Sequence, residues 1–326
     1  MSYLRRTVPP WLRPRRAACA PRAALALLGL WAAAAPATDA PAALPVTQVA
    51  PGVFVHLGKP LGLDAPGHDD IANIGFVVGA RCVAVIDSGG SMRVGDGLRA
   101  ALRQRSPLPV CYLINTHVHV DHVLGNAAFR DEHPQFVGHA GLAAALARSR
   151  DFFLQNYAAD LEAPATATEI IGADRGVEVG PDVALDLGGR RLKLRAWPKA
   201  HSDCDLTVYD EATGTLFTGD LLFVGRTPVV DGSIKGWVSA DESLAAVPVK
   251  HVVPGHGAPG TDLAAALAPQ QRYLDALLEG VRTQLALGKP LQDALRDVQP
   301  DKSAWLLFEQ THPRNVARVY QELEWE

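Results

Sequence analysis

Short apolar runs separated by polar breaks dominate the first half of the chain, the pattern of β-strands joined by loops. Residues 91–106 instead show helical spacing of Val94, Leu98 and Leu102, with Ser91 placed to cap the helix. The run PLPVCYLINT then returns to a strand, so a β-α-β step ends where a group of histidines begins. The strands predicted before the helix are GVFVHLG, ANIGFVVG and CVAVIDS.

The second half of the chain repeats this alternation with more hairpins. Residues 140–158 are rich in Ala and Leu and predict a helix, and from Asp262 onward the pattern is helical to the end. The strands predicted between them are DVALDLG, RRLKLRAWP, DLTVYD, TLFTGDLLF and KHVVPGHG, with DEATG as a hairpin turn. Two successive sets of strands and helices predict an α/β fold with four layers, αββα. A single doubly wound sheet fits the hairpins less well.

The first 37 residues have a different composition from the rest. They carry six arginines and no acidic residue, then the apolar run AALALLGLWAAAA and the small-residue site APA. This order is typical of a secretory signal peptide, and 13 apolar residues are too few to span a bilayer comfortably. We therefore expect a periplasmic or secreted protein, with a Pro/Ala linker at 38–45 and no stable membrane insertion after cleavage.

Charge and cysteine content limit which partners and which redox chemistry we expect for the protein. Without the six arginines, 25 basic residues face 35 acidic ones, a formal charge of 25 − 35 = −10. Nucleic acid is therefore not an expected partner. The mature chain would keep Cys82, Cys111 and Cys204, an odd number that gives no complete disulfide framework. Cys82 and Cys111 lie in apolar runs, where we expect small buried hydrophobic side chains.

Three histidines and an aspartate lie within six positions of THVHVDHVLGN, directly after an apolar strand. His117 and His119 are two residues apart, which places both side chains on one side of an extended chain. Asp121 and His122 follow after the chain turns, so they can reach a neighbouring point. A solvated loop seldom alternates histidine with valine, and we interpret this motif as the ligand set of one or two metal ions.

Three more polar residues follow apolar strands later in the chain, namely His201, Asp220 and His256. Loops at the carboxyl ends of strands converge on one point, so these residues can join the first group. Asp220 is the most informative, because a carboxylate between LFTG and LLF is buried and requires a cation. The remaining histidines have no such neighbours, and we expect structural roles for His56, His68, His133, His139, His251 and His312.

In this order and spacing the residues resemble the metallo-β-lactamase superfamily, whose signature is His-x-His-x-Asp-His followed by a distant histidine, an aspartate and a last histidine. The resemblance implies an αββα sandwich over residues 38–260, with 261–326 as a C-terminal helical extension on the same domain. It also implies two Zn²⁺ ions. One would be held by His117, His119 and His201, the other by Asp121, His122 and His256, with Asp220 bridging.

Within that superfamily, DIANIGFVVGARCVAVIDSGGS, INTHVHVDHVLGNAAF, GDLLFVGRTPVVDGSIKGW and HPRNVARVYQELEWE resemble the exported quinoprotein relay system zinc metallohydrolases, a SoxH-related group. This likeness implies a link to a periplasmic quinoprotein dehydrogenase system. The turn after His201, HSDCDLTV, departs from the glycine-containing turn of many members. Cys204 lies three residues after that ligand, and we expect it to be inert or outside the ligand set.

These residues support three hypotheses for function. The first is a dinuclear zinc hydrolase that uses a metal-bound hydroxide on an ester, thioester or amide of a small-molecule substrate, a lactam included, with Asp121 and Asp220 as catalytic carboxylates. The second is an iron redox protein of the same fold, which the imidazole of His119 disfavours. The third is a metal-bound accessory or maturation partner of a quinoprotein pathway without turnover.

Substrate contacts are expected in two loops and in the C-terminal helices. The loops are GKPLGLDAPGHDD and VGRTPVVDGSIKGW. Such loops vary independently of the scaffold that holds the metals. Arg226 and Lys235 are basic residues that could hold an anionic group, although the simpler expectation for both is solvated surface.

Overall fold

The structure is a computed structural model that describes residues 41–161 and 170–325. The predicted signal peptide at 1–37 lies outside the described residues, so it stays a prediction. Residues 41–326 form one compact unit that contains all of the elements named below.

The first β-sheet has seven strands in the order β1-β2-β3-β4-β5-β6-β7. Its first four strands pair antiparallel, and β4 to β7 pair parallel. The strands are β1 (Thr47–Ala50), β2 (Val53–His56), β3 (Ile74–Val78), β4 (Val83–Ile86), β5 (Val110–Ile114), β6 (Gln135–His139) and β7 (Arg175–Val177).

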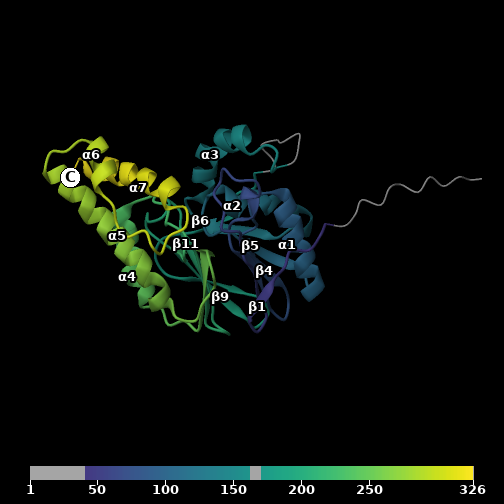
Figure 1. Cartoon of the computed structure of the whole chain (residues 1–326). Helices are drawn as coiled ribbons and strands as arrows, with labels where there is room; N and C mark the ends of the chain where they lie inside the picture. The colour runs from purple at the N-terminus through teal and green to yellow at the C-terminus, as the bar shows by residue number, and fades with distance from the viewer. Residues whose placement is uncertain (1–40, 162–169, 326) are drawn as a thin grey trace, which may run out of the picture. The chain divides into compact units, whose positions relative to one another are not determined.

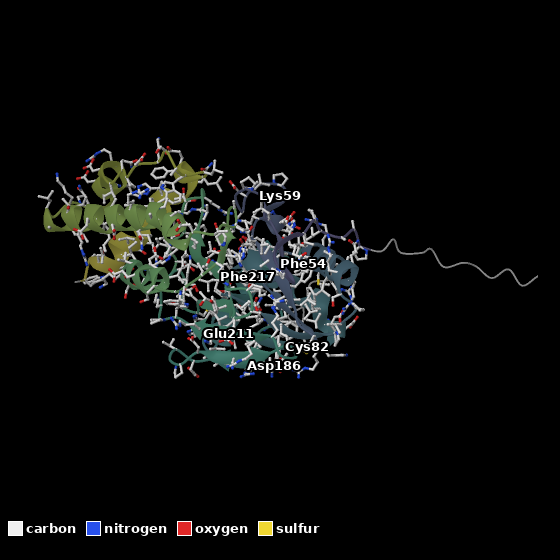
Figure 2. The ribbon with its side chains drawn as sticks, turned by 90° about the horizontal axis from the view of Figure 1, so that it is seen from below. Phe54, Lys59, Cys82, Asp186, Glu211 and Phe217 are labelled. Carbon is white, nitrogen blue, oxygen red and sulfur yellow. A yellow bond between two sulfur atoms is a disulfide. The ribbon has the colours of Figure 1, made fainter. Side chains whose placement is uncertain are left out.

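The second sheet has five strands in the order β12-β11-β10-β9-β8. All its pairs are antiparallel except β11 with β12. Figure 2 labels Phe217 of this sheet and Phe54 of the first. The strands are β8 (Val183–Asp186), β9 (Arg191–Ala196), β10 (Leu206–Asp210), β11 (Thr215–Phe223) and β12 (His251–His256).

Helices pack against both sheets (Figure 1). None of the helices in the described ranges is long and apolar enough to cross a membrane. The α-helices are α1 (Met92–Arg105), α2 (Val120–Val123), α3 (Leu142–Asn156), α4 (Ile234–Ala245), α5 (Leu263–Ala286), α6 (Leu291–Asp297) and α7 (Phe308–Leu323), and the 3₁₀ helices are η1 (His68–Asp70) and η2 (Leu124–Glu132).

The apolar residues divide into cores that define four layers. In β4, Val83 and Val85 pack in a cluster with residues of α1, whereas Ala84 and Ile86 belong to the cluster between the sheets. This division follows the two-residue period of a strand. In β11, Phe217 packs between the sheets, and Leu216 packs in a cluster with residues of α4, α5 and α7. The predicted αββα arrangement is confirmed.

Most of the predicted elements are present near their expected positions. Ser91 caps α1, since its Oγ accepts a hydrogen bond of 3.1 Å from the backbone N–H of Val94. The sequence pattern missed β1, β6 and β7, which have three to five residues each. It also missed α4, which begins at Ile234 inside a segment expected to be a loop. Such short segments carry too little periodic signal.

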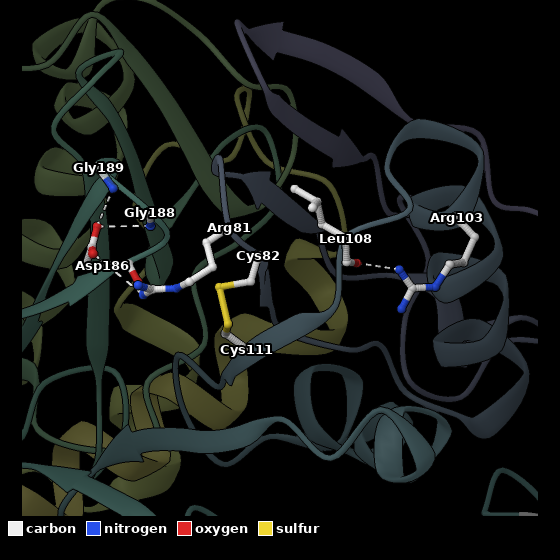
Figure 3. Close-up of a disulfide and its surroundings, with 8 residues drawn as sticks. All are labelled: Arg81, Cys82, Arg103, Leu108, Cys111, Asp186, Gly188 and Gly189. Carbon is white, nitrogen blue, oxygen red and sulfur yellow. Dashed lines mark hydrogen bonds and ion pairs between the residues drawn. A yellow bond between two sulfur atoms is a disulfide. The ribbon is translucent and has the colours of Figure 1, made fainter.

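The expectation for Cys82 and Cys111 is wrong, because the two residues form a disulfide with Cα atoms 5.7 Å apart (Figure 3). Cys82 directly precedes β4 and Cys111 lies within β5, and the register of this parallel pair places Val83 opposite Val110. The two cysteines are 29 residues apart in the sequence, so their proximity follows from the strand order and could not be read from the sequence pattern. Among the described residues, Cys204 is the one free cysteine, and it is buried.

Candidate metal centre

The HVHVDH motif lies between the end of β5 and the first turn of α2. The backbone of His119 is extended, with φ −68° and ψ 151°, and α2 begins at the next residue. As the two-residue spacing predicted, His117 and His119 meet on one side, with Nε2 and Nδ1 3.1 Å apart. Val118 and Val120, which flank His119, are buried in a separate apolar cluster with Leu142 and Phe153. Their packing holds the ligand loop in place.

A first cluster joins the two motif histidines to His201 and Asp220. Nε2 of His201 lies 3.0 Å from Nδ1 of His119. Oδ2 of Asp220 lies 3.7 Å from Nε2 of His117 and 3.5 Å from Nε2 of His201. Three imidazole nitrogens and a carboxylate oxygen thus converge within 4.8 Å of one another.

A second cluster consists of Asp121, His122 and His256. Nε2 of His256 lies 3.3 Å from Oδ2 of Asp121 and 3.3 Å from Oδ2 of Asp220, and Nε2 of His122 lies 3.2 Å from Oδ1 of Asp220. Yet His122 Nε2 and Asp220 Oδ1 are buried atoms for which residues 41–161 and 170–325 supply no properly oriented hydrogen bond. Buried polar atoms need a partner, and a cation between the clusters satisfies both. The residues therefore fit a pair of metal ions that share Asp220.

The far nitrogen of each imidazole determines which nitrogen faces the centre. Nδ1 of His201 lies 2.8 Å from the carbonyl oxygen of Val229, and Nδ1 of His256 lies 2.8 Å from that of Ile71. A carbonyl oxygen only accepts, so Nδ1 donates in both rings. In the neutral rings Nε2 therefore keeps a lone pair for a metal. Partners of this kind orient metal ligands and raise their affinity.

Asp87 orients two further ligands and was not predicted as a site residue. Its Oδ2 accepts hydrogen bonds from His122 Nδ1 at 2.8 Å and from the Thr116 hydroxyl at 2.7 Å. The Thr116 oxygen in turn lies 3.0 Å from Nδ1 of His117. Asp87 is buried and has φ 54°, a left-handed conformation that aspartate tolerates better than most residues. An aspartate at the end of the strand VAVID was the available sequence signal.

Asp231 and the C-terminal helix α7 support the other side of the centre. Oδ2 of Asp231 lies 3.0 Å from His119 Nε2, which leaves Nδ1 of that ring for the cluster. Arg318 of α7 donates to the carbonyl oxygens of Asp231 and Gly232 at 3.1 and 2.5 Å. Asn315 of α7 accepts a hydrogen bond of 2.9 Å from the backbone N–H of Val230. We call residues 226–233 the support loop, and α7 holds it in place.

Electrostatics keep most ligands in the form that binds a cation. Burial would raise the pKa of Asp220, but the imidazoles of His256, His122 and His117 hold it well below its usual range. Burial lowers the pKa of His117 well below normal and that of His201 to about 4. Burial opposes the charge on His122 too, yet the carboxylates of Asp220, Asp87 and Asp121 raise its pKa well above normal. A cation bound by this ring would therefore displace a proton.

The other residues considered from the sequence lie outside the two clusters. His56 and His68 contact Asp70 and Asp160 at 2.6 and 3.1 Å, and His312 lies 3.0 Å from the Tyr273 hydroxyl. His133, His139 and His251 belong to neither cluster. Cys204 packs in the apolar cluster of Val118 and Leu142, and burial raises the pKa of its thiol to about 12. This cysteine is a packing residue.

A cleft of about 700 Å³ opens onto the metal centre and has a size that suits a small molecule. The loop around Leu63, helix α3, the support loop and helix α7 contribute its walls. The two loops and the C-terminal helices in which we expected substrate contacts therefore do contribute residues to the cleft. The expectation of a solvated Arg226 is wrong, because this residue is 9% exposed and lines the cleft.

Solved structures with the same fold include several enzymes. A metallo-β-lactamase from Pontibacter korlensis is 20% identical with a TM-score of 0.57, over 71% of this chain and 99% of the other. A metallo-β-lactamase family protein from Thermus thermophilus is 21% identical with a TM-score of 0.59, over 85% and 93%. The inverting sec-alkylsulfatase Pisa1 from Pseudomonas sp. is 16% identical with a TM-score of 0.65, over 86% of this chain and 50% of the other.

Sequence comparison defines the family. No curated protein sequence matches the chain. The family profile described as Metallo-beta-lactamase superfamily matches residues 68–256, which is more than half of the chain and includes all seven residues of the two clusters. The chain therefore belongs to the metallo-β-lactamase superfamily and is a metallohydrolase of that fold.

Proposed function

We propose that this metallohydrolase is a dinuclear zinc enzyme that cleaves an ester, thioester or amide of a small molecule. One observation carries the proposal: the two oxygens of buried Asp220 face imidazoles of both clusters, and Oδ1 has no hydrogen-bond partner within the described part of the chain. A structural zinc site closes with four ligands and gains little from a second ion. A shared carboxylate at the floor of an open cleft instead suits catalysis.

The donor set favours zinc, since imidazoles and carboxylates without thiolate suit this ion. When bound, a zinc pair supplies a Lewis acid and lowers the pKa of water to about 7. His117, His119 and His201 would hold one ion, and Asp121, His122 and His256 the other. Asp220 supplies negative charge to both clusters and remains ionised at neutral pH, because its pKa is held well below normal.

The chain's own residues fix the geometry in which the substrate reacts. Asp121 is 5% exposed, lines the cleft and stays ionised, since His122 and His256 hold its pKa down against burial. It can therefore accept a proton or a hydrogen bond from the attacking water. His119 lines the same cleft and is fixed by Asp231 at 3.0 Å. Most of the ligand side chains are buried, which strengthens electrostatic interactions among them.

Metal analysis and a substrate panel test the proposal together. We expect about two zinc ions per chain and hydrolysis of at least one lactam, lactone, ester or thioester. Asp220→Asn should lower zinc content and abolish turnover. The proposal fails if the purified protein holds well under one zinc per chain and Asp220→Asn leaves hydrolysis unchanged. A visible absorption band of bound iron would favour the redox alternative instead.

We further propose export to the periplasm or the exterior and a role beside a quinoprotein dehydrogenase system. The Cys82–Cys111 disulfide supports an oxidising compartment, and the partner rests on the sequence resemblance. N-terminal sequencing of secreted protein should show cleavage near residue 37. Co-purification should recover the dehydrogenase. A dehydrogenase partner without any hydrolysis of the panel would favour the accessory role.

A further inference from the structure

Arg226 is a buried cation beside the candidate metal centre and has no carboxylate partner among the described residues. It is 9% exposed, and its Nη1 lies 3.0 Å from Nδ1 of His256. That imidazole nitrogen already donates to Ile71 at 2.8 Å, so it gives the guanidinium little compensation. No carboxylate oxygen of the described residues lies within 4.0 Å of the Arg226 side chain. Arginine is seldom buried unpaired, because desolvation is costly.

Two more arginines line the same cleft from helix α7. Arg314 is exposed and forms no ion pair with a described residue, and Arg318 donates to backbone carbonyls of the support loop. A bridge between Arg226 and Leu306, just before α7, joins the two segments. Apart from the candidate metal ligands Asp121 and Asp220, the carboxylates in the lining are Asp231, whose Oδ2 lies 3.0 Å from His119 Nε2, and exposed Asp64. The basic groups therefore remain available to an anion.

The wall supplied by helix α3 has the opposite character. Phe152, Phe153 and Tyr157 form an aromatic group with ring centroids 6.0 to 6.4 Å apart, and all three line the cleft. Phe152 is 56% exposed and Leu63, from the neighbouring loop, is 43% exposed. Helices α3 and α7 thus line the same cleft with side chains of different character, aromatic from α3 and basic from α7. Apolar side chains exposed inside a cleft indicate an apolar ligand surface.

We propose that the substrate is an amphiphilic anion, with an apolar body on the α3 wall and a carboxylate, sulfonate or similar oxyanion on Arg226 and Arg314. This inference rests on the proposed hydrolase, because it places the cleaved bond over the metal centre between the two walls. Arginine binds such oxyanions through two parallel N–H groups. The acidic groups of the centre would be neutralised by the metal ions they hold, so they would not repel the anion from Arg226.

A matched pair of esters tests this inference. The neutral ester is p-nitrophenyl hexanoate, and the anionic one is the p-nitrophenyl monoester of adipic acid, which has the same chain length. We expect the zinc-loaded protein to favour the anionic ester through a lower KM. Arg226→Met and Arg314→Met should reduce that preference, by about tenfold for Arg226, since a charge-assisted hydrogen bond has that value. Arg282→Met on the exposed face of α5 is the matched control.

Calorimetry gives a second measurement that needs no turnover. Octanesulfonate should bind the zinc-loaded protein at least tenfold more tightly than octanol or methanesulfonate, and both cleft variants should weaken it. Zinc content is measured in each variant, because Arg226 contacts His256. Should Arg226→Met not fold, Arg314→Met still decides the outcome.

Two results separate this inference from the proposed function. If the protein hydrolyses both esters with equal KM and binds octanesulfonate no better than octanol, the inference is wrong, but the proposed hydrolase function stands. Arginine-dependent binding of octanesulfonate with no hydrolysis of any ester refutes the hydrolase and leaves the anion site. Unchanged sulfonate binding in both variants with full zinc content also overturns the inference.

Discussion

Asn315→Leu tests whether helix α7 supports the metal centre or only the fold. The Asn315 side chain accepts from the Val230 N–H at 2.9 Å and donates to the Pro228 carbonyl at 2.6 Å and the Tyr273 hydroxyl at 2.8 Å. Leucine has a similar volume but makes none of these bonds. The support loop then loses two of its links to α7.

The size of the effect follows from the groups left without partners. Val230 N–H and the Pro228 carbonyl lose a buried partner each, at about 1 to 3 kcal/mol per group. We expect the free energy of unfolding to fall by about 2 to 6 kcal/mol. The loop also carries Val229 O and Asp231, which orient His201 and His119. Loss of such supporting contacts weakens metal binding about 10- to 100-fold.

Chelator competition and urea unfolding measure the two effects separately. Tryptophan fluorescence follows unfolding, and buried Trp237, whose ring lies 5.1 Å from that of His201, contributes to the signal. Gln321→Leu, at an exposed position of the same helix, is the matched control. Zinc affinity equal to that of the wild type, together with lower stability, would refute the supporting role of α7 and leave only a role in folding.

Three further predictions follow from buried groups elsewhere. Asp87→Asn tolerates the left-handed backbone but removes the carboxylate on His122 Nδ1, so zinc affinity should fall about 10- to 100-fold in the chelator assay while the circular dichroism spectrum is kept. Burial raises the pKa of Asp241 to about 7, so the folded wild-type protein loses stability as the pH rises from about 4 to 7 and this carboxyl must ionise. In urea unfolding, the stability of Asp241→Asn relative to the wild type should therefore rise by up to about 4 kcal/mol over that pH interval. A stability difference that does not change with pH would contradict this. Replacing Cys82 and Cys111 by alanine should cost about 3 to 4 kcal/mol, which thermal unfolding with and without reductant can check.

Local spacing explains why the layers and the ligand motif were predictable. A strand period of two fixes the faces of Val83 and Ile86 from sequence alone, and the same period brings His117 to His119. Asp220 was also accessible, because a carboxylate inside an apolar strand has few explanations other than a cation. These inferences need no knowledge of the strand order.

Contacts that depend on the strand order or on distant segments were not predictable. The Cys82–Cys111 bond needs β4 and β5 to be parallel neighbours, and an odd cysteine count pointed away from it. The burial of Arg226 depends on a bridge to Leu306, 80 positions later. Sequence pattern treats an isolated arginine as solvated, because it usually is.

The support loop contributes to the metal centre and to the proposed anion site at the same time. Through Val229 O and Asp231 it orients a histidine from each half of the chain, and through Arg226 it brings a cation to the cleft. Helix α7 fixes this loop with buried hydrogen bonds and also supplies Arg314 to the same wall. A change in α7 therefore alters metal affinity and anion recognition together. A change at exposed Phe152 of α3 alters only the apolar wall, because the buried residues of α3, Leu142 and Phe153, pack against the ligand loop. Divergence in substrate among chains with this centre is thus easier at Phe152 than through α7.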